Sequence, residues 1–353
     1  MTVFDVPAVA GGLTLLLSLL LPFAVKPLLV RLRIMDVPNE RSSHERPVLR
    51  GLGLAVLIAM AAGGGASVLA LFGVGRSGEG AAPWSVLLVV VAGSLLAGLL
   101  GLAEDLRGLS VRTRSAALLL IAAGAAIGIL LAARASDDAA VSLPLWGSIL
   151  LVAYAVLFIS SYINVANFMD GLNGISGFHG AIAGLTFAAA GWLTGQVWLV
   201  AAGLVLAAGF IGFLPWNLTK PGAFLGDVGS YLLGGATAIT SFAALLQGVP
   251  LLASIGPMVI YFGDVGVTLV KRVRAGHKWD EPHKEHTYQR LQQRGYTHVQ
   301  ASLMAAACTA ATSLLGLCSR FTGLLGTLVL LASGLVVLLV YLALPRLLPA
   351  RGE

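Results

Sequence analysis

The sequence has very few charged residues. Asp, Glu, Lys and Arg make up only 11% of its 353 residues, whereas hydrophobic residues make up 58%. This composition excludes an ordinary soluble globular protein. Only two cysteines are present, Cys308 and Cys318, and ten residues of helix would separate them by about 15 Å, too far for a disulfide. There is also no repeat of 20 to 50 residues and no linker rich in Pro or Ser. We therefore expect one membrane domain over residues 1–353.

Long apolar stretches fill most of the chain. A bilayer core of about 30 Å needs roughly 20 apolar residues for each helical crossing. Eleven stretches meet this need: 6–30, 52–74, 84–102, 116–133, 146–163, 178–194, 197–214, 231–246, 249–270, 299–317 and 323–344. The predicted fold class is all-α, a polytopic integral membrane protein with about eleven transmembrane helices.

Basic residues predict how the chain crosses the membrane. Only Arg76, Arg134 and Arg320 lie between the stretches on one side, whereas most other Lys and Arg residues flank the opposite side. Because cytoplasmic loops accumulate Lys and Arg, we expect the N-terminus outside and the C-terminus in the cytoplasm. Topology also explains the net charge of +6, so no nucleic-acid partner is predicted.

Four short loops carry nearly all the polar chemistry. They cover residues 101–114, 164–177, 224–230 and 277–291. The predicted topology places all four at the cytoplasmic ends of helices. The sequence therefore predicts an active site at the inner face of the membrane.

The loop at 164–177 combines amides, a carboxylate and glycines. Asn164, Asn167 and Asp170 recur every third residue, so on a continuing helix they would share one face. Such groups suit a polar ligand with phosphates, although Asn and Gly also cap helix ends. Both interpretations stay open for this loop alone.

Acidic residues occur in all four loops. Asp227 lies between two glycines just before an apolar stretch, where an aspartate is also a common helix N-cap. However, Glu104, Asp105, Asp170 and Asp227 together place four carboxylates at one membrane face. Mg²⁺ prefers a few carboxylates plus phosphate oxygens of a substrate. The set is therefore a candidate Mg²⁺ site.

The ninth stretch and the loop after it contain further ionisable groups. Asp264 lies within an apolar stretch, where an ionisable residue marks a functional site or an internal ion pair or hydrogen bond that orients the next loop. His283 and His286 flank Lys284. Zinc would need further ligands at a typical spacing, which are missing, so we prefer phosphate binding by imidazole and ammonium groups.

The order of motifs resembles a known family. DVPNERSSHERPVLRGLG (36–53), GLAED, NVANFMDGLNG, FLGDVGS and the loop with histidines follow one another as in the polyprenyl-phosphate N-acetylhexosamine-1-phosphate transferases of bacteria. The resemblance covers most of the chain and implies a multi-pass enzyme of the inner (plasma) membrane. Such enzymes transfer a sugar 1-phosphate from a UDP-N-acetylhexosamine to undecaprenyl or another polyprenyl phosphate, release UMP and need Mg²⁺, or Mn²⁺ in its place. They begin the synthesis of O-antigen, lipopolysaccharide or cell-wall glycans.

The resemblance also implies roles for the residues of the four loops. Asp227 is the main metal ligand, with Asn167 beside it. The nucleotide sugar is held by Asn164, Asn167 and Asp170, and its phosphates by His283, Lys284 and His286. Asp105, with Glu104, orients or deprotonates the lipid phosphate. We call residues 36–53 the first loop and residues 277–291 the fifth loop. In the first loop, His44, Arg41 and Arg50 are candidates for binding the lipid phosphate or for balancing charge without a metal, and the arginines fit a role in topology alone equally well.

Three departures from the family pattern matter. Glu104 replaces the first of two adjacent aspartates, and Asn173 stands where many members have a second Asp after the Asp-Gly pair. The fifth loop lacks consecutive histidines and resembles the subgroup that uses N-acetylfucosamine- or N-acetylquinovosamine-type sugars. This loop argues against transfer of UDP-N-acetylmuramoyl-pentapeptide, one of two alternatives. The other is a transporter or flippase, whose site would lie near the bilayer midplane. The sequence does not decide between a monomer and a homodimer.

Overall fold

The computed structural model describes residues 5–31, 35–36, 48–76, 84–135, 143–219, 222–277 and 283–351. Helices make up nearly all of this chain. The long ones are α1 (Asp5–Arg31), α2 (Gly53–Arg76), α3 (Trp84–Arg107), α4 (Val111–Ala135), α5 (Leu145–Met169), α6 (Ile175–Thr194), α7 (Val197–Leu218), α8 (Gly226–Leu246), α10 (Val259–Arg274), α12 (His298–Cys318) and α13 (Leu324–Leu347). The shorter elements are α9 (Leu251–Ile255), η1 (Gly256–Met258), α11 (Thr287–Gln293), η2 (Ser319–Phe321), and the strands β1 (Met35–Asp36) and β2 (Val48–Leu49).

The all-α membrane fold is confirmed, since each predicted apolar stretch is helical. Ten described helices are long and apolar enough to cross a membrane, with residues 251–274 counted as one. The sixth predicted stretch, α6, is not among the ten. Its sequence includes four glycines, a serine and His179, which lower its hydropathy. This helix nevertheless packs inside the bundle between α7 and α12.

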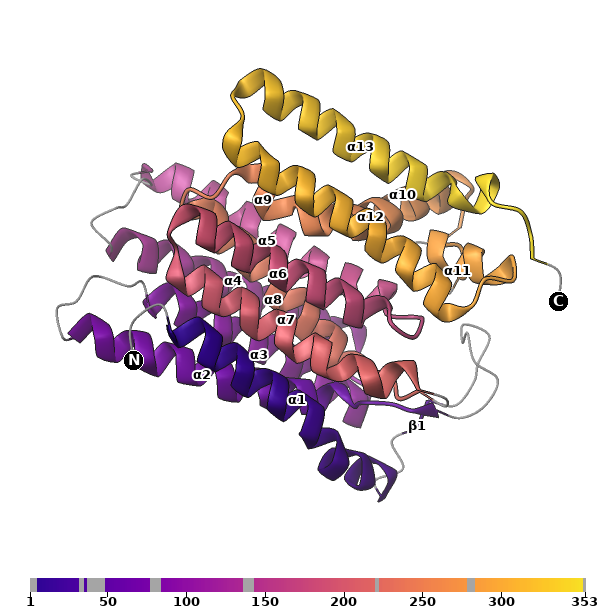
Figure 1. Ribbon diagram of the computed structural model, residues 1–353, viewed down its shortest axis with the longest axis horizontal. Coiled ribbons are helices and arrows are strands. Elements are labelled where there is room, and N and C mark those ends of the chain that lie inside the picture. Colours follow the sequence, from indigo (N-terminus) through magenta and orange to yellow (C-terminus); the bar gives the residue numbers. More distant parts are fainter. Residues whose placement is uncertain are drawn as a thin grey trace.

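The long helices run side by side, with α8 at the centre and α13 at the edge (Figure 1). Almost all of α8 is buried, because α3, α5 and α2 pack around it. Almost none of α13 is buried, and its exposed side chains include Leu328, Leu335 and Leu339. An apolar surface of this kind is what a bilayer covers.

The ninth predicted stretch is a broken helix instead of a continuous one. Residues 251–255 form α9, the turn Gly256–Met258 is 3₁₀, and α10 continues from Val259. Pro257 explains the break, because proline lacks the N–H that an α-helix needs at this position. The last turn of α10 contains three basic residues. Gly276 follows the helix with φ +84°.

Two glycines allow a close helix contact near the polar end. A Cβ atom on Gly101 of α3 would lie 2.1 Å from the Asp227 carbonyl oxygen of α8, so only glycine fits there. Gly226, the first residue of α8, has φ +76°, a conformation that other residues rarely adopt. These two positions bring the end of α3 against the start of α8.

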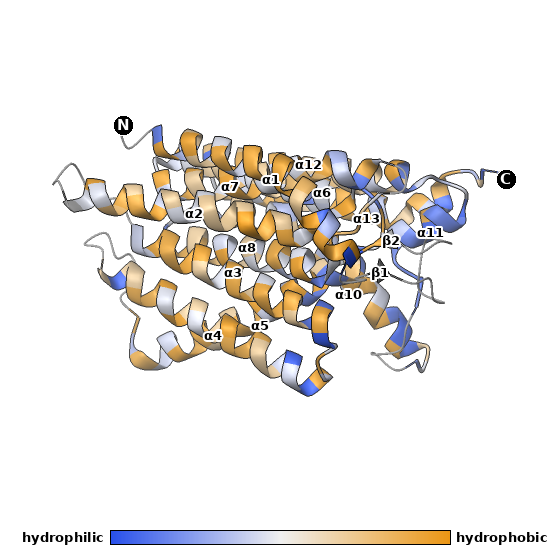
Figure 2. Cartoon of the chain, turned by 90° about the horizontal axis from the view of Figure 1, so that it is seen from below, coloured by the Kyte–Doolittle hydropathy of each residue, from blue (hydrophilic) through white to orange (hydrophobic). Residues whose placement is uncertain are grey.

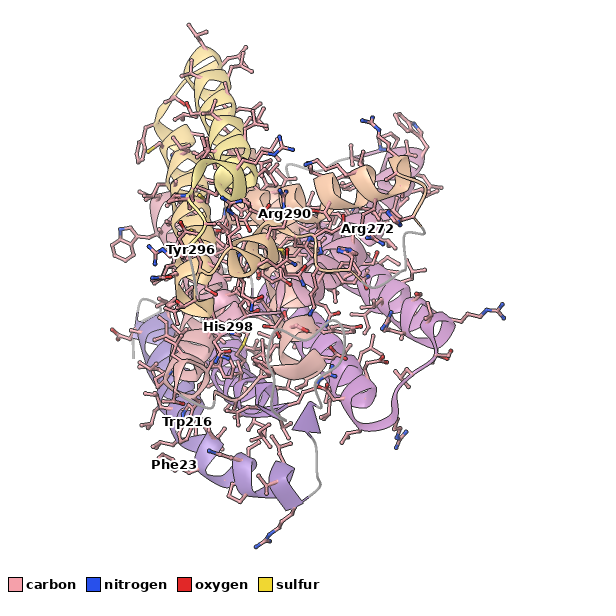
Figure 3. The ribbon with its side chains drawn as sticks, turned by 90° about the vertical axis from the view of Figure 1, so that its right-hand side faces the viewer. Phe23, Trp216, Arg272, Arg290, Tyr296 and His298 are labelled. Atoms are coloured by element: carbon pink, nitrogen blue, oxygen red, sulfur yellow. The ribbon has the colours of Figure 1, made fainter. Side chains whose placement is uncertain are left out.

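Hydrophilic residues gather at one end of the bundle, where β1, β2 and α11 lie (Figure 2). β1 pairs antiparallel with β2, with Met35 opposite Leu49. Figure 3 looks onto this end, where Trp216 lies beside Phe23 with ring centroids 4.7 Å apart. The described parts of all four predicted polar loops meet here, as the contacts below show.

Candidate active site

Asp227 lies at the centre of the polar end, in the first turn of α8. Its Oδ2 atom forms an ion pair with Arg50 Nη2 at 2.7 Å, and its Oδ1 atom accepts a hydrogen bond from Asn167 Nδ2 at 2.8 Å. Asn167 also donates to Ser230 Oγ, one turn further along α8. Only 18% of the Asp227 side chain is exposed. Three segments far apart in the sequence thus converge on one carboxylate.

Asp105 of α3 fixes the start of α8. Its two carboxylate oxygens accept hydrogen bonds from the backbone N–H groups of Asp227 and Val228, at 3.1 and 2.9 Å. An anion is stabilised at a helix N-terminus, where these N–H groups have no partner in the helix. Arg50 Nε lies 2.9 Å from Asp105 Oδ1. Asp105 therefore positions Asp227 directly, and its predicted action on a lipid phosphate remains a prediction.

Asp170 adds a third carboxylate just after the end of α5. Ser176 Oγ, in the first turn of α6, donates to Asp170 Oδ1 at 2.6 Å. Burial raises the pKa of the Asp170 carboxyl to about 7, and the charges of Asp227 and Asp105 act in the same direction. The hydrogen bond from Ser176 and the charge of Arg50 oppose this rise. A cation bound nearby would favour the ionised form of Asp170.

The donor set fits a divalent cation that shares its coordination with a substrate. In the described part of the chain, no donor reaches the Oδ1 atom of Asn167, which leaves this amide oxygen available beside Asp227. However, among the described residues no group of three or more His, Cys, Asp or Glu side chains could hold a metal ion. A cation here would therefore complete its shell with water and phosphate oxygens, as Mg²⁺ does.

The fifth loop lies next to this cluster. Tyr288 Oη donates to the Phe168 carbonyl oxygen at 2.9 Å, at the end of α5. Burial raises the pKa of the Tyr288 hydroxyl far above its ordinary value, so it stays a donor. The ring of His286 stacks on Tyr288 with an interplanar angle of 5°, and the His283 ring centroid lies 4.8 Å from that of His286. The loop thus docks its histidines beside the segment that carries Asp170.

Asp264 holds the fifth loop in place. Its carboxylate accepts hydrogen bonds from Thr287 N at 3.0 Å and from Thr268 Oγ1 and Tyr341 Oη at 3.3 and 3.0 Å. His286 Nδ1 lies 3.6 Å away. Asp264 is fully buried, whereas Lys271, on the same helix, is exposed. Of the two roles that the sequence left open, the structure shows hydrogen bonding that orients the loop.

Three other predicted site residues contact partners outside the carboxylate cluster. Glu104 Oε1 pairs with Arg114 Nη1 at 3.4 Å, and Glu104 Oε2 accepts from Leu109 N, so it closes the turn between α3 and α4. Asn164 donates to the Ser160 carbonyl oxygen of its own helix. Lys284 is half-buried, and its carbonyl accepts from Gln293 Nε2.

Two more predictions concern the first loop and the loop after α5. His44 and Arg41 lie outside the described residues. Asn173 contacts two other helices: its Nδ2 donates to the Asn217 carbonyl oxygen of α7, and on α12 its Oδ1 lies 3.2 Å from His298 Nδ1 and its carbonyl oxygen accepts from Ser302 Oγ. It therefore joins α6 to α7 and α12. Figure 3 labels His298 at this end of α12.

Sequence reasoning understated Arg50 and missed Ser176, Ser230 and Tyr288. Ser230 follows Asp227 by three residues, a spacing that places both on one helical face. That spacing was a usable signal. Arg50 had none, because loop arginines that bind a site and those that set topology look alike in a sequence.

An all-helical membrane bundle with carboxylates, an arginine and an amide gathered at one end defines an integral membrane enzyme. Residues 87–245 match glycosyl transferase family 4. The chain is also 30% identical over 307 residues to decaprenyl-phosphate N-acetylglucosaminephosphotransferase of Mycolicibacterium smegmatis, covering 79% of this chain and 74% of that protein. The chain therefore belongs to glycosyl transferase family 4, and its activity is that of a transferase of sugar phosphates.

Two further relatives are also named as sugar-phosphate transferases. A probable undecaprenyl-phosphate N-acetylglucosaminyl 1-phosphate transferase of Bacillus subtilis is 28% identical over 302 residues, which cover 84% of this chain and 80% of that protein. A phospho-N-acetylmuramoyl-pentapeptide-transferase of Desulforudis audaxviator is 30% identical over 272 residues, 68% of this chain and 79% of its own length. These names confirm the resemblance at the level of the family.

Proposed function

We propose that the protein transfers an N-acetylhexosamine 1-phosphate from a UDP-sugar to a polyprenyl phosphate at the cytoplasmic face of the plasma membrane. A phosphate oxygen of the lipid attacks the phosphorus that carries the sugar. The bond from this phosphorus to the bridging oxygen breaks, and UMP leaves with that oxygen. The product is a polyprenyl diphosphate-sugar, the starting unit of a surface or cell-wall glycan. One catalytic domain over residues 1–353 performs the whole reaction.

One observation carries this proposal: Asp105 and Asp227 share Arg50 at one end of a membrane bundle, and the charges of all three act on the buried carboxyl of Asp170. Both reactants bring phosphates to the reaction, so catalysis depends on neutralising charge and aligning groups. Water-soluble UDP-sugars reach such a site from the aqueous side, while the lipid phosphate reaches it from the adjacent bilayer surface. A site at the end of the bundle suits these two substrates together.

Mg²⁺ is the cation that this donor set supports. Asp227 and the amide oxygen of Asn167 would hold it, with the remaining positions left to water and donor phosphates. When bound, the metal would supply positive charge to the diphosphate of the donor. Mn²⁺ has the same preference for oxygen ligands and would substitute for it.

The protein's own groups divide the remaining work. Asn167 and Asp170 would bind the nucleotide sugar, and His283, Lys284 and His286 would bind phosphate oxygens. Asp105 fixes the positions of Asp227 and Arg50 relative to each other. A lipid phosphate is largely ionised at neutral pH, since the second pKa of a phosphomonoester is about 6. Direct attack by this phosphate therefore needs no strong base.

The basic residues at the polar end support its cytoplasmic location. Lys271, Arg272 and Arg274 form the last turn of α10, and Arg107 ends α3. Positive charge of this density favours the cytoplasmic side of a bacterial membrane. The cluster also lies at helix ends instead of at the bilayer midplane, which favours a transferase over a transporter.

Release of UMP from purified protein tests the proposed function. The assay contains undecaprenyl phosphate, Mg²⁺ and one of several donors: UDP-N-acetylglucosamine, the N-acetylfucosamine and N-acetylquinovosamine analogues, or UDP-N-acetylmuramoyl-pentapeptide. We expect UMP from one of the first three donors, and only with both lipid and metal present. UMP release that needs no lipid, or none from any donor in folded protein, would contradict the proposal.

A further inference from the structure

The backbone around Arg50 is anchored beside the start of α8. The segment that carries it is joined to the loop before α8 by backbone hydrogen bonds. Phe224 N donates to the Leu49 carbonyl oxygen at 2.8 Å, Leu52 N to that of Phe224 at 3.1 Å, and Gly53 N to that of Leu225 at 2.8 Å. The backbone on both sides of Arg50 is therefore fixed relative to the start of α8, which carries Asp227.

The guanidinium group of Arg50 contacts two carboxylates through different nitrogen atoms. Nε lies 2.9 Å from Asp105 Oδ1, and Nη2 lies 2.7 Å from Asp227 Oδ2. The Asp105 side chain is 2% exposed and accepts two backbone N–H groups, so its contact with Nε is part of the fold. Asp227 is more open, and the Arg50 side chain is 36% exposed. The contact with Asp227 is thus the one that a ligand from solution can displace.

We propose that Arg50 occupies Asp227 in the ligand-free protein, gives up this carboxylate when a divalent cation binds, and then binds a phosphate of the nucleotide donor. The inference rests on the proposed function. A cation and a guanidinium at hydrogen-bonding distance compete for Asp227 Oδ2, because both carry positive charge and need its lone pairs. Nε remains on Asp105, so Nη2 is released within reach of the ligand at Asp227.

The exchange makes Arg50 a positioning and substrate-binding residue with two opposite effects. It weakens binding of the metal alone, because the metal must displace it. It strengthens binding of the diphosphate, because a guanidinium is a strong phosphate donor. Loss of Arg50 should therefore strengthen binding of the metal alone and weaken binding of the diphosphate. A purely structural arginine would weaken both when removed.

The test measures two affinities in Arg50→Gln and in wild-type protein. Mn²⁺ alone is titrated by electron paramagnetic resonance, and UDP is titrated at saturating Mn²⁺ by calorimetry. We expect Arg50→Gln to bind Mn²⁺ about tenfold more tightly and UDP about tenfold more weakly. Unchanged or weaker Mn²⁺ binding would overturn the exchange, and unchanged UDP binding would overturn the phosphate contact.

Arg107→Gln is the matched control. It makes the same change of charge two residues after Asp105, on an exposed side chain at the same end of the bundle. A general electrostatic effect would shift the Mn²⁺ affinity of both variants equally and so overturn the proposal. If Arg50→Gln does not fold, Arg50→Lys takes its place, because one ammonium group cannot repeat both contacts. Arg50→Lys should also bind Mn²⁺ more tightly and UDP more weakly than the wild-type protein. Wild-type protein that binds UDP equally well without Mn²⁺ would instead refute the proposed function.

Discussion

The polar end of the protein contains two buried aspartates that do the same structural work in different surroundings. Asp105 of α3 accepts backbone N–H groups at the start of α8, and Asp264 of α10 accepts the backbone N–H of Thr287 at the start of α11. Each carboxylate thereby fixes the first turn of a different helix, which lies elsewhere in the sequence. Each helix start carries a predicted site residue, Asp227 in one case and His286 in the other.

The neighbours of the two aspartates differ. Asp105 shares a half-exposed arginine with Asp227, so its surroundings can respond to a ligand. Asp264 is enclosed by the hydroxyl groups of Thr268, Thr287 and Tyr341 and is fully buried. The comparison shows that a buried carboxylate at a helix start positions the residues of that helix accurately. Whether those residues can also bind a ligand depends on their access to solvent and to other charged groups.

The largest expected effect comes from Asp227 itself. Asp227→Asn removes the charge at the centre of the cluster, and UMP release should fall at least about 1,000-fold. Circular dichroism should show an unchanged helical content. Asp5→Asn makes the same change in the first turn of α1 and should leave the rate unaltered. A rate for Asp227→Asn within tenfold of wild type would remove this residue from the centre of the site.

Removing Asp264 should reduce stability most strongly. Asp264→Ala leaves buried donors on Thr268, Thr287 and Tyr341 without an acceptor, at a cost of about 3 kcal/mol or more in the free energy of unfolding. Denaturant titration in detergent measures this loss. Asp264→Asn, which keeps one acceptor oxygen, should lose less. Equal stability of Asp264→Ala and wild type would show that α11 is held by other contacts.

Asp170 should make stability depend on pH when no divalent cation is present. Its folded pKa of about 7 lies above the ordinary value of 3.8, so the folded protein holds this proton more tightly than the unfolded chain. The contribution of Asp170 to stability is therefore greatest at low pH, falls as pH rises from about 4 to 7, and is constant above. Thermal unfolding of Asp170→Asn should lack this fall, and adding Mg²⁺ should reduce it in wild type. Parallel curves for the two proteins would contradict the pKa.

A smaller effect is expected at Tyr341, which ties α13 to Asp264. Tyr341→Phe removes one hydrogen bond of 3.0 Å and should cost about 1 kcal/mol in the free energy of unfolding. Tyr154→Phe is the control, because Tyr154 is 52% exposed on α5. Equal losses in the two variants would mean that the Tyr341 hydroxyl adds nothing to the docking of α13.

Much of the fold was predictable because membrane helices follow composition and length alone. The apolar stretches marked every long helix, but the break at Pro257 and the weak hydropathy of α6 depend on local residues that a count of apolar positions averages away. The carboxylates of the site were also predictable, since they occur in short polar loops. Their partners were not: Arg50 reaches Asp227 across 177 positions of sequence (227 minus 50), and the backbone hydrogen bonds that join residues 49–53 to the loop before α8 bring the two together.

Electron–nuclear double resonance of bound Mn²⁺ tests the central claim most directly, namely that Asp227 and the donor phosphates share one cation at the start of α8. With Mn²⁺ and UDP present, the wild-type protein should show coupling between the metal and the phosphorus nuclei of UDP. Asp227→Asn should show no protein-bound Mn²⁺ and no such coupling. The same phosphorus coupling in both proteins would place the metal and the donor elsewhere and contradict the account.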